Sequence, residues 1–169
     1  EVKSVRRTDR FEISLADGKV ISSDYLIIAA GGHPKKKAYE WIEKLGHQIK
    51  DPIPSLFTFN LPKHPSNELM GLSQQANIKI LGTNEEAYGP LLFTHWGMSG
   101  PAVLKLSARA ADYLHSKNYK FKFEVEWLPN AGDFINEQRK HAANKQVNLL
   151  KPEEFSKRFW AYLLDRAGI

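Results

Sequence analysis

The sequence predicts an α+β protein, with a β-meander and a β-barrel-like part followed by a small helical part. Apolar and polar residues alternate over 11–15 and 119–127, which is the period of a half-buried strand. An unbroken apolar run, 26–30, is typical of a strand that is covered on both faces. Beyond residue 129 the composition becomes more polar and helical, so we expect the strands to precede the helical part.

The first 32 residues are predicted to form a meander that ends in a buried strand. Asp17-Gly18 is a strong tight-turn signal between two strand-like segments. The apolar run then ends in Gly31 and Gly32, whose missing Cβ atoms let a ligand or another backbone approach closely. Open α/β sheets bind nucleotides at such strand ends. We therefore assign 1–32 to part of a dinucleotide-binding domain, and predict that Ala30, Gly31 and Gly32 contact a cofactor.

Residues 33–128 are predicted to form a β-rich inserted domain with two helices. The first helix places Trp41 and Leu45 on one face, and Gly46 is positioned to cap its C-terminus. Prolines bracket a short strand that alternates from Phe57 to Leu61. Further strands are expected at 78–80, 91–93 and 119–127. The last of these places aromatic residues on its core-facing side.

The segment 95–100, HWGMSG, is predicted to be a turn in front of the second helix, which Pro101 opens. The first N–H groups of a helix lack internal partners and favour an anion or a carbonyl oxygen. Gly97, Ser99 and Gly100 are therefore predicted to contact a cofactor. The alternative is a tight strand-to-helix connection with a capping serine.

His95 stands at the end of the strand that precedes this turn. An imidazole there can donate a hydrogen bond to a ligand or shuttle a proton, which makes His95 the candidate catalytic residue. The alternative is a histidine that only bonds a neighbouring backbone group.

Residues 129–169 are predicted to form a helical subdomain. Asp133 is expected to cap a helix that runs to about Lys145. Pro152 is expected to open a last helix, and Gly168 to end it.

Composition excludes several classes of function. The sequence has no cysteine, which excludes disulfides and thiolate chemistry and suits a reducing cytoplasm. The six histidines have no metal-binding spacing, and no apolar run is long enough to span a membrane. The net charge of +5 favours a solvated surface over a nucleic-acid patch. A non-catalytic basic module that binds RNA or a protein partner remains the rival hypothesis.

Two long segments, LIIAAGGHPKKKAYEWIEKLGHQIKDPIPSLFTFNL and GPLLFTHWGMSGPAVLKLS, resemble a known family. They are similar to the BaiN-like, or aminoacetone-oxidase-like, FAD-dependent oxidoreductases, which are flavoproteins of the YhiN type. The string FTHWGMSGP is the most specific part of this resemblance, which covers nearly the whole sequence.

The resemblance implies that this chain is an inserted domain with part of the FAD domain, belonging to a longer bacterial flavoprotein. The implied partners are the rest of its own flavin domain, a small-molecule substrate and NAD(P)H. The sequence contains no G-x-G-x-x-G for the pyrophosphate of FAD. We therefore expect FAD in the longer protein and none on this chain alone.

Overall fold

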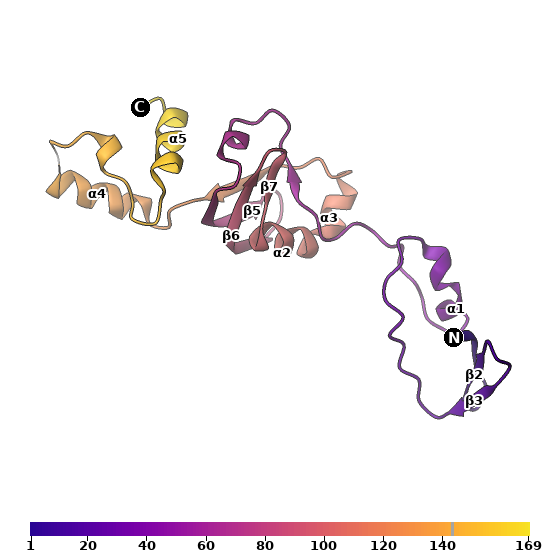
Figure 1. Ribbon diagram of the computed structural model, residues 1–169. Coiled ribbons are helices and arrows are strands. Elements are labelled where there is room, and N and C mark those ends of the chain that lie inside the picture. Colours follow the sequence, from indigo (N-terminus) through magenta and orange to yellow (C-terminus); the bar gives the residue numbers. More distant parts are fainter. Residues whose placement is uncertain (143) are drawn as a thin grey trace. The chain divides into compact units, whose positions relative to one another are not determined.

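The computed structural model describes residues 1–142 and 144–169 (Figure 1). Contacts within the chain divide it into two compact units, Glu1–Ile53 and Pro54–Ile169. We call them the first unit and the second unit. Both helices and strands are present, which confirms the predicted α+β class. Within the described residues, none of the helices has the length and apolar character that crossing a membrane requires.

The first unit begins with a three-stranded antiparallel meander, as predicted. Its strands are β1 (Val2–Arg7), β2 (Phe11–Leu15) and β3 (Val20–Ser23). The tight turn between β2 and β3 lies at the predicted position. Gly18 adopts φ +84°, and the backbone N–H of Lys19 donates to Oδ1 of Asp17 at 3.1 Å. The local sequence is therefore sufficient to place this hairpin.

A short helix follows, made of η1 (Lys36–Tyr39) and α1 (Glu40–Glu43). Its C-cap is Lys44 and not the predicted Gly46, which lies two residues further on with φ +94° and donates its N–H to Glu43 O. Trp41 lines one apolar hollow together with residues of β1, β2 and the run 26–30, so residues 33–53 group with the meander. The division inferred from the sequence, 1–32, 33–128 and 129–169, stays a prediction.

The predicted buried strand after β3 is wrong for this structure. Residues 24–33 have no regular secondary structure, and the Tyr25 and Ile27 side chains are 87% and 90% exposed. A central strand needs a hydrogen-bonded neighbour on each side, but neither sheet of the described chain includes these residues. The apolar sequence is strand-like, yet its partner strands are missing from the described residues.

The second unit is built on one antiparallel sheet of five strands in the order β4-β7-β6-β5-β8. The strands are β4 (Phe59–Asn60), β5 (Ser73–Ile80), β6 (Glu86–Thr94), β7 (Gly97–Ser99) and β8 (Phe123–Glu126). A 3-10 turn, η2 (Pro65–Leu69), precedes β5. Helices α2 (Pro101–Arg109) and α3 (Ala111–Ser116) follow β7.

The core of the second unit lies between this sheet and α2. Residues of β5 and β6 alternate between buried and exposed, so one face of the sheet is covered. The apolar side chains that α2 and α3 direct at the core are buried, and they comprise Val103, Leu106, Ala110 and Leu114. The strand predicted over 119–127 pairs only along β8, but its aromatic side does pack on the core.

The helical part contains α4 (Ala131–His141), η3 (Val147–Leu149) and α5 (Lys157–Ala167). Two predicted helix starts need correction. Asn130 is the N-cap of α4, which places Asp133 in its first turn. Ser156 is the N-cap of α5, because its side chain accepts from the N–H of Phe159, so Pro152 lies outside the helix. Gly168 caps α5 as predicted, with φ +75°.

The first of these helices also ends earlier than predicted. Position 143, within the helix predicted to reach Lys145, lies outside the described residues, and α4 ends at His141. The start of the last helix joins the core of the sheet through rings. The Phe159 ring centre lies 5.8 Å from that of Phe93 and 5.0 Å from that of Trp127.

Candidate functional site

The hairpin between β6 and β7 carries the residues that the sequence singled out. Its turn is only His95-Trp96, and Oγ1 of Thr94 donates to Gly97 O at 3.0 Å across it. The predicted turn over 95–100 is therefore wrong for 97–99. Gly97–Ser99 form a strand, because β7 pairs with β4 on one side and β6 on the other.

His95 lies on the surface at the tip of this hairpin. Its ring packs edge-on against Trp96, with ring centres 4.2 Å apart. The Trp96 carbonyl accepts from the N–H of Leu61 at 2.8 Å, which ties the tip to the end of β4. Among the described residues, no hydrogen bond engages the His95 imidazole. The ring is thus available to a ligand, and its catalytic role stays a prediction.

Gly97 and Gly100 are required by the packing of their own sheet. Gly97 has φ +151°, and a Cβ there would collide with the backbone of Phe59 and lie 2.8 Å from the Leu61 nitrogen. Gly100 has φ +100°, and its Cβ would lie 2.7 Å from Pro90 O. Both values fall in the region that L-residues avoid. The space that a cofactor would need at these two glycines is filled by neighbouring strands.

The N-terminus of α2 is likewise covered by the sheet. The N-cap residue of α2 is Gly100, and no side chain caps the helix. Ser99 therefore does not act as the capping serine that the alternative hypothesis expects. Ala102 and Val103, the next helical residues, are fully buried. A Cβ on Gly89 of β6 would lie 3.8 Å from the Ala102 nitrogen. Cofactor contact by Gly97, Ser99 and Gly100 stays a prediction, and the observed geometry explains them as parts of the fold.

The first unit presents its predicted cofactor residues differently. Ala30, Gly31 and Gly32 are exposed, and a Cβ on Gly31 would have no neighbour within 4 Å. Gly31 has φ +72°, so a glycine is favoured there by conformation and not by crowding. This backbone is open to an approaching group, whereas the backbone at Gly97 and Gly100 is not.

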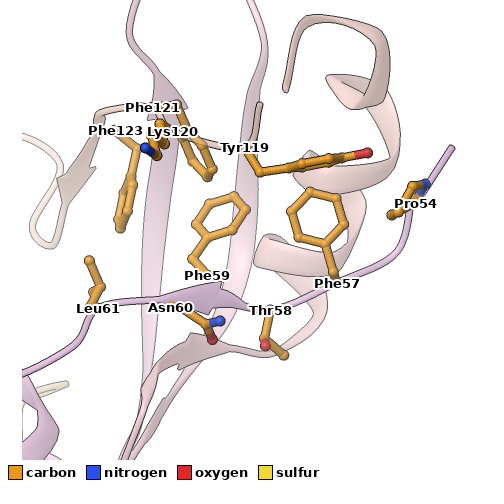
Figure 2. Close-up of a pocket in the computed structure, with 10 residues that line it drawn as sticks. All are labelled: Pro54, Phe57, Thr58, Phe59, Asn60, Leu61, Tyr119, Lys120, Phe121 and Phe123. Atoms are coloured by element: carbon orange, nitrogen blue, oxygen red, sulfur yellow. The ribbon is translucent and has the colours of Figure 1, made fainter. Parts of the chain in front are cut away.

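Sequence reasoning missed a feature of the second unit that we call the seam. The outermost strands of the sheet, β4 and β8, are brought face to face by its curl, and rings from each side meet between them (Figure 2). The ring centre of Phe59 lies 4.9 Å from that of Phe121 and 5.1 Å from that of Phe123. Phe57 meets Tyr119 at 5.4 Å, edge to face.

A cavity of about 580 Å³ follows the seam. Its lining residues are Pro54, Phe57, Thr58, Phe59, Asn60, Leu61, Tyr119, Lys120, Phe121 and Phe123. The two alternating patterns were visible in the sequence, but nothing local indicated that they face each other. That proximity comes from the curl of the whole sheet.

The same geometry bears on the rival RNA-binding hypothesis. Phe121 and Phe123 pack against the core, whereas Lys120 and Lys122 are exposed on the opposite side of the chain. A platform for single-stranded nucleic acid mixes exposed rings with cations. The second unit does not present that arrangement here. In the described part of the chain, no three potential metal-binding side chains are grouped together.

Fold and site together define a class: a curled, barrel-like sheet that carries a small helical appendage. A family model described as the HI0933-like protein barrel and H2TH domain matches residues 53–169. The match covers more than half of the sequence and begins one residue before the second unit. The chain belongs to this HI0933-like family, which confirms the resemblance to the BaiN-like and YhiN-type FAD-dependent oxidoreductases. This barrel and H2TH domain is a domain of flavoproteins.

Proposed function

We propose that this chain forms the substrate-side cover of the flavin in an FAD-dependent oxidoreductase, and that a longer protein holds the FAD. The match of 53–169 to the barrel and H2TH domain carries this proposal. In the intact enzyme the bound flavin would supply hydride transfer, with a small amine or carbonyl compound, or NAD(P)H, as its partner. The cysteine-free sequence suits the reducing cytoplasm.

The first unit supports the rest of the flavin domain as the main partner. Its apolar run is exposed, and a hollow of about 580 Å³ lies between this run and the meander. Burying one large apolar side chain contributes roughly 1.5–3 kcal/mol. Tyr25, Ile27 and Ile28 therefore favour a state in which further strands cover them. Such strands would also satisfy the unpaired backbone of this run.

The fit to FAD differs between the two sets of glycines. Gly31 and Gly32 offer uncovered backbone, so this segment is the better candidate for passing close to the cofactor. The space beside Gly97 and Gly100 is already occupied by neighbouring backbone, so these two glycines would support the barrel. A flavin also needs its pyrophosphate at a helix N-terminus and its ring enclosed on both faces. We therefore infer that the chain alone retains no FAD.

Absorbance in the visible range tests this proposal. The longer flavoprotein is expected to purify with the yellow flavin spectrum, and the 169-residue chain to purify without it. A colourless longer protein that cannot be loaded with FAD would refute the flavoenzyme assignment. Stoichiometric FAD on the chain alone would refute the inferred role as a cover.

His95 is proposed to make a polar contact with substrate or flavin from the hairpin tip. We expect His95→Gln in the longer flavoprotein to lower kcat/KM by roughly tenfold, the equivalent of one lost hydrogen bond. Thermal stability should not change, because His95 is exposed. His141→Gln, at the exposed end of α4, is the matched control. Equal activity of the two variants would exclude His95 from the site.

A further inference from the structure

The seam has two open strand edges. β4 and β8 end the strand order of the sheet, so each has one edge that no strand of the described chain pairs with. Open edges present unpaired N–H and C=O groups and act as templates for another strand. The matched family domain is described as a barrel, and a barrel has no free edges. This five-stranded sheet is therefore curled but not closed.

The cavity at the seam runs along β4 and along the residues that lead into β8, where it reaches Phe123. Successive side chains of a strand point to opposite faces, so a cavity on one face touches only alternate residues. Here five consecutive residues, 57–61, line the cavity, and 119–121 line it from the other side. Residues whose side chains point to opposite faces line the same space, so the cavity reaches the edge of the backbone as well as the rings. A ligand in this cavity would meet main-chain groups as well as rings.

The chemistry of the lining suits a peptide strand. Rings of Phe59, Phe121 and Phe123 form the inner side, where apolar side chains would pack (Figure 2). Thr58, Asn60 and Lys120 provide polar groups along the same cavity. The edges are bridged by ring contacts and not by strand pairing. The N–H groups of Phe57 and Tyr119 already donate to Ser107 Oγ and Leu114 O, so an inserted strand would pair with the outer main-chain groups of 58–60 and 121–126.

We propose that the seam accepts one extended peptide strand, supplied by the rest of the flavoprotein, which pairs with β4 and β8 and closes the barrel. Its alternate side chains are apolar and face the rings, and an acidic residue in its outer set would meet Lys120. This inference rests on the proposed function, because that function supplies the longer polypeptide. Closure would link the barrel physically to the flavin domain.

Peptide binding to the 169-residue chain tests the proposal. The probes are overlapping synthetic peptides of about ten residues, enough for one strand, that cover the flavoprotein sequence outside this chain. We expect one contiguous region to bind and to slow amide exchange in both 58–60 and 121–126. A peptide of the same composition in scrambled order is the control. If no peptide protects these amides, the proposal is refuted.

Backbone N-methylation of the binding peptide then examines how it pairs. A strand between two neighbours donates alternate N–H groups to opposite sides. N-methylation at odd or at even positions should therefore each weaken binding at least tenfold. Loss with only one set would show addition to a single edge, and loss with neither would show side-chain binding alone. Either result refutes closure of the barrel.

Three further outcomes separate this proposal from its alternatives. A dimer of the chain that protects the same amides without peptide would assign the seam to a second copy and refute the proposal. If peptides fail to bind while the longer protein is yellow, the seam proposal fails and the flavin assignment stands. If the longer protein lacks FAD although a peptide bridges both edges, the flavin assignment fails alone.

Discussion

The two units of this chain contain similar strand-like sequences but differ in what those sequences bury. The second unit has a continuous core of rings and aliphatic side chains between its sheet and α2. Among the described residues of the first unit, Leu45 at 9% exposure is the only apolar side chain counted as buried. Its most apolar segment, 26–30, is open to solvent. An apolar pattern therefore forms a core only where its partner strands are in the same unit.

This difference in burial predicts which substitutions the chain tolerates. The largest effect is expected for Gly97→Ala, because a Cβ there meets the Phe59 backbone, which cannot move without breaking β4 from β7. The positive φ alone costs about 1–2 kcal/mol, and the collision adds to it. We expect the free energy of unfolding in urea to fall by more than about 4 kcal/mol, or the second unit not to fold.

Gly71→Ala is the matched control in the same unit. Gly71 also has a positive φ, +85°, but a Cβ there has no neighbour within 4 Å. The control should lose only the conformational term, about 1–2 kcal/mol. Equal losses for the two variants would contradict the close packing of β7 against β4.

The next effect compares the two units directly. Phe93 is fully buried and stacks on Trp127, so Phe93→Ala should cost about 3–5 kcal/mol in the urea unfolding of the chain. Ile27→Ala removes a side chain that is almost fully exposed, and should change the same measurement by less than about 0.5 kcal/mol.

In the longer flavoprotein the cost of Ile27→Ala should rise to about 2 kcal/mol or more, if the flavin domain covers this run. A cost that stays near zero there would show that the run remains exposed. A large cost in the isolated chain would show that the first unit buries it unaided.

The local sequence predicts the parts of this fold that local physics decides. The Asp17-Gly18 turn, the helix that Pro101 opens and the Gly168 cap depend on a few neighbouring residues, and all three are confirmed. The glycines of the β6–β7 hairpin were attributed to ligand binding because their crowding comes from Phe59 and Pro90, which are remote in sequence. The seam was missed for the same reason, since the curl of a sheet is not a local property.

A smaller loss of stability is expected when the hydrogen bond between α2 and Phe57, a residue of the seam, is removed. Oγ of the buried Ser107 accepts from the N–H of Phe57 at 3.1 Å and donates to Leu104 O at 2.9 Å. Ser107→Ala leaves the Phe57 N–H without a partner, so we expect a loss of about 1–3 kcal/mol in urea unfolding. Amide exchange of Phe57 should also become faster.

Ser116→Ala is the control for this loss. Its hydroxyl donates to Tyr113 O at 2.7 Å on the surface, where water can replace it, so less than about 0.5 kcal/mol is expected. If Ser107→Ala is as mild as this control, the hydroxyl does not anchor the seam.

The smallest effect is expected at an exposed ion pair of the first unit, which has little buried core. Nζ of Lys36 lies 3.0 Å from Oδ1 of Asp51, and this hydrogen bond and the Asp51 charge raise the pKa of Lys36 above 10.5. Because the folded pKa is raised, the pair stabilises the unit below pH 10.5, and its contribution is lost as pH rises through the folded pKa.

Asp51→Asn should therefore lower the pKa of Lys36 in an NMR titration of its side-chain carbon and nitrogen signals. Glu43→Gln is the comparison, because Glu43 raises the same pKa by charge alone and has the smallest influence. We expect the larger decrease from Asp51→Asn and no difference in stability between wild type and this variant above the folded pKa. If both variants lower the pKa equally, Lys36 senses a diffuse surface field, and this contact does not join the helix to the segment before Ile53.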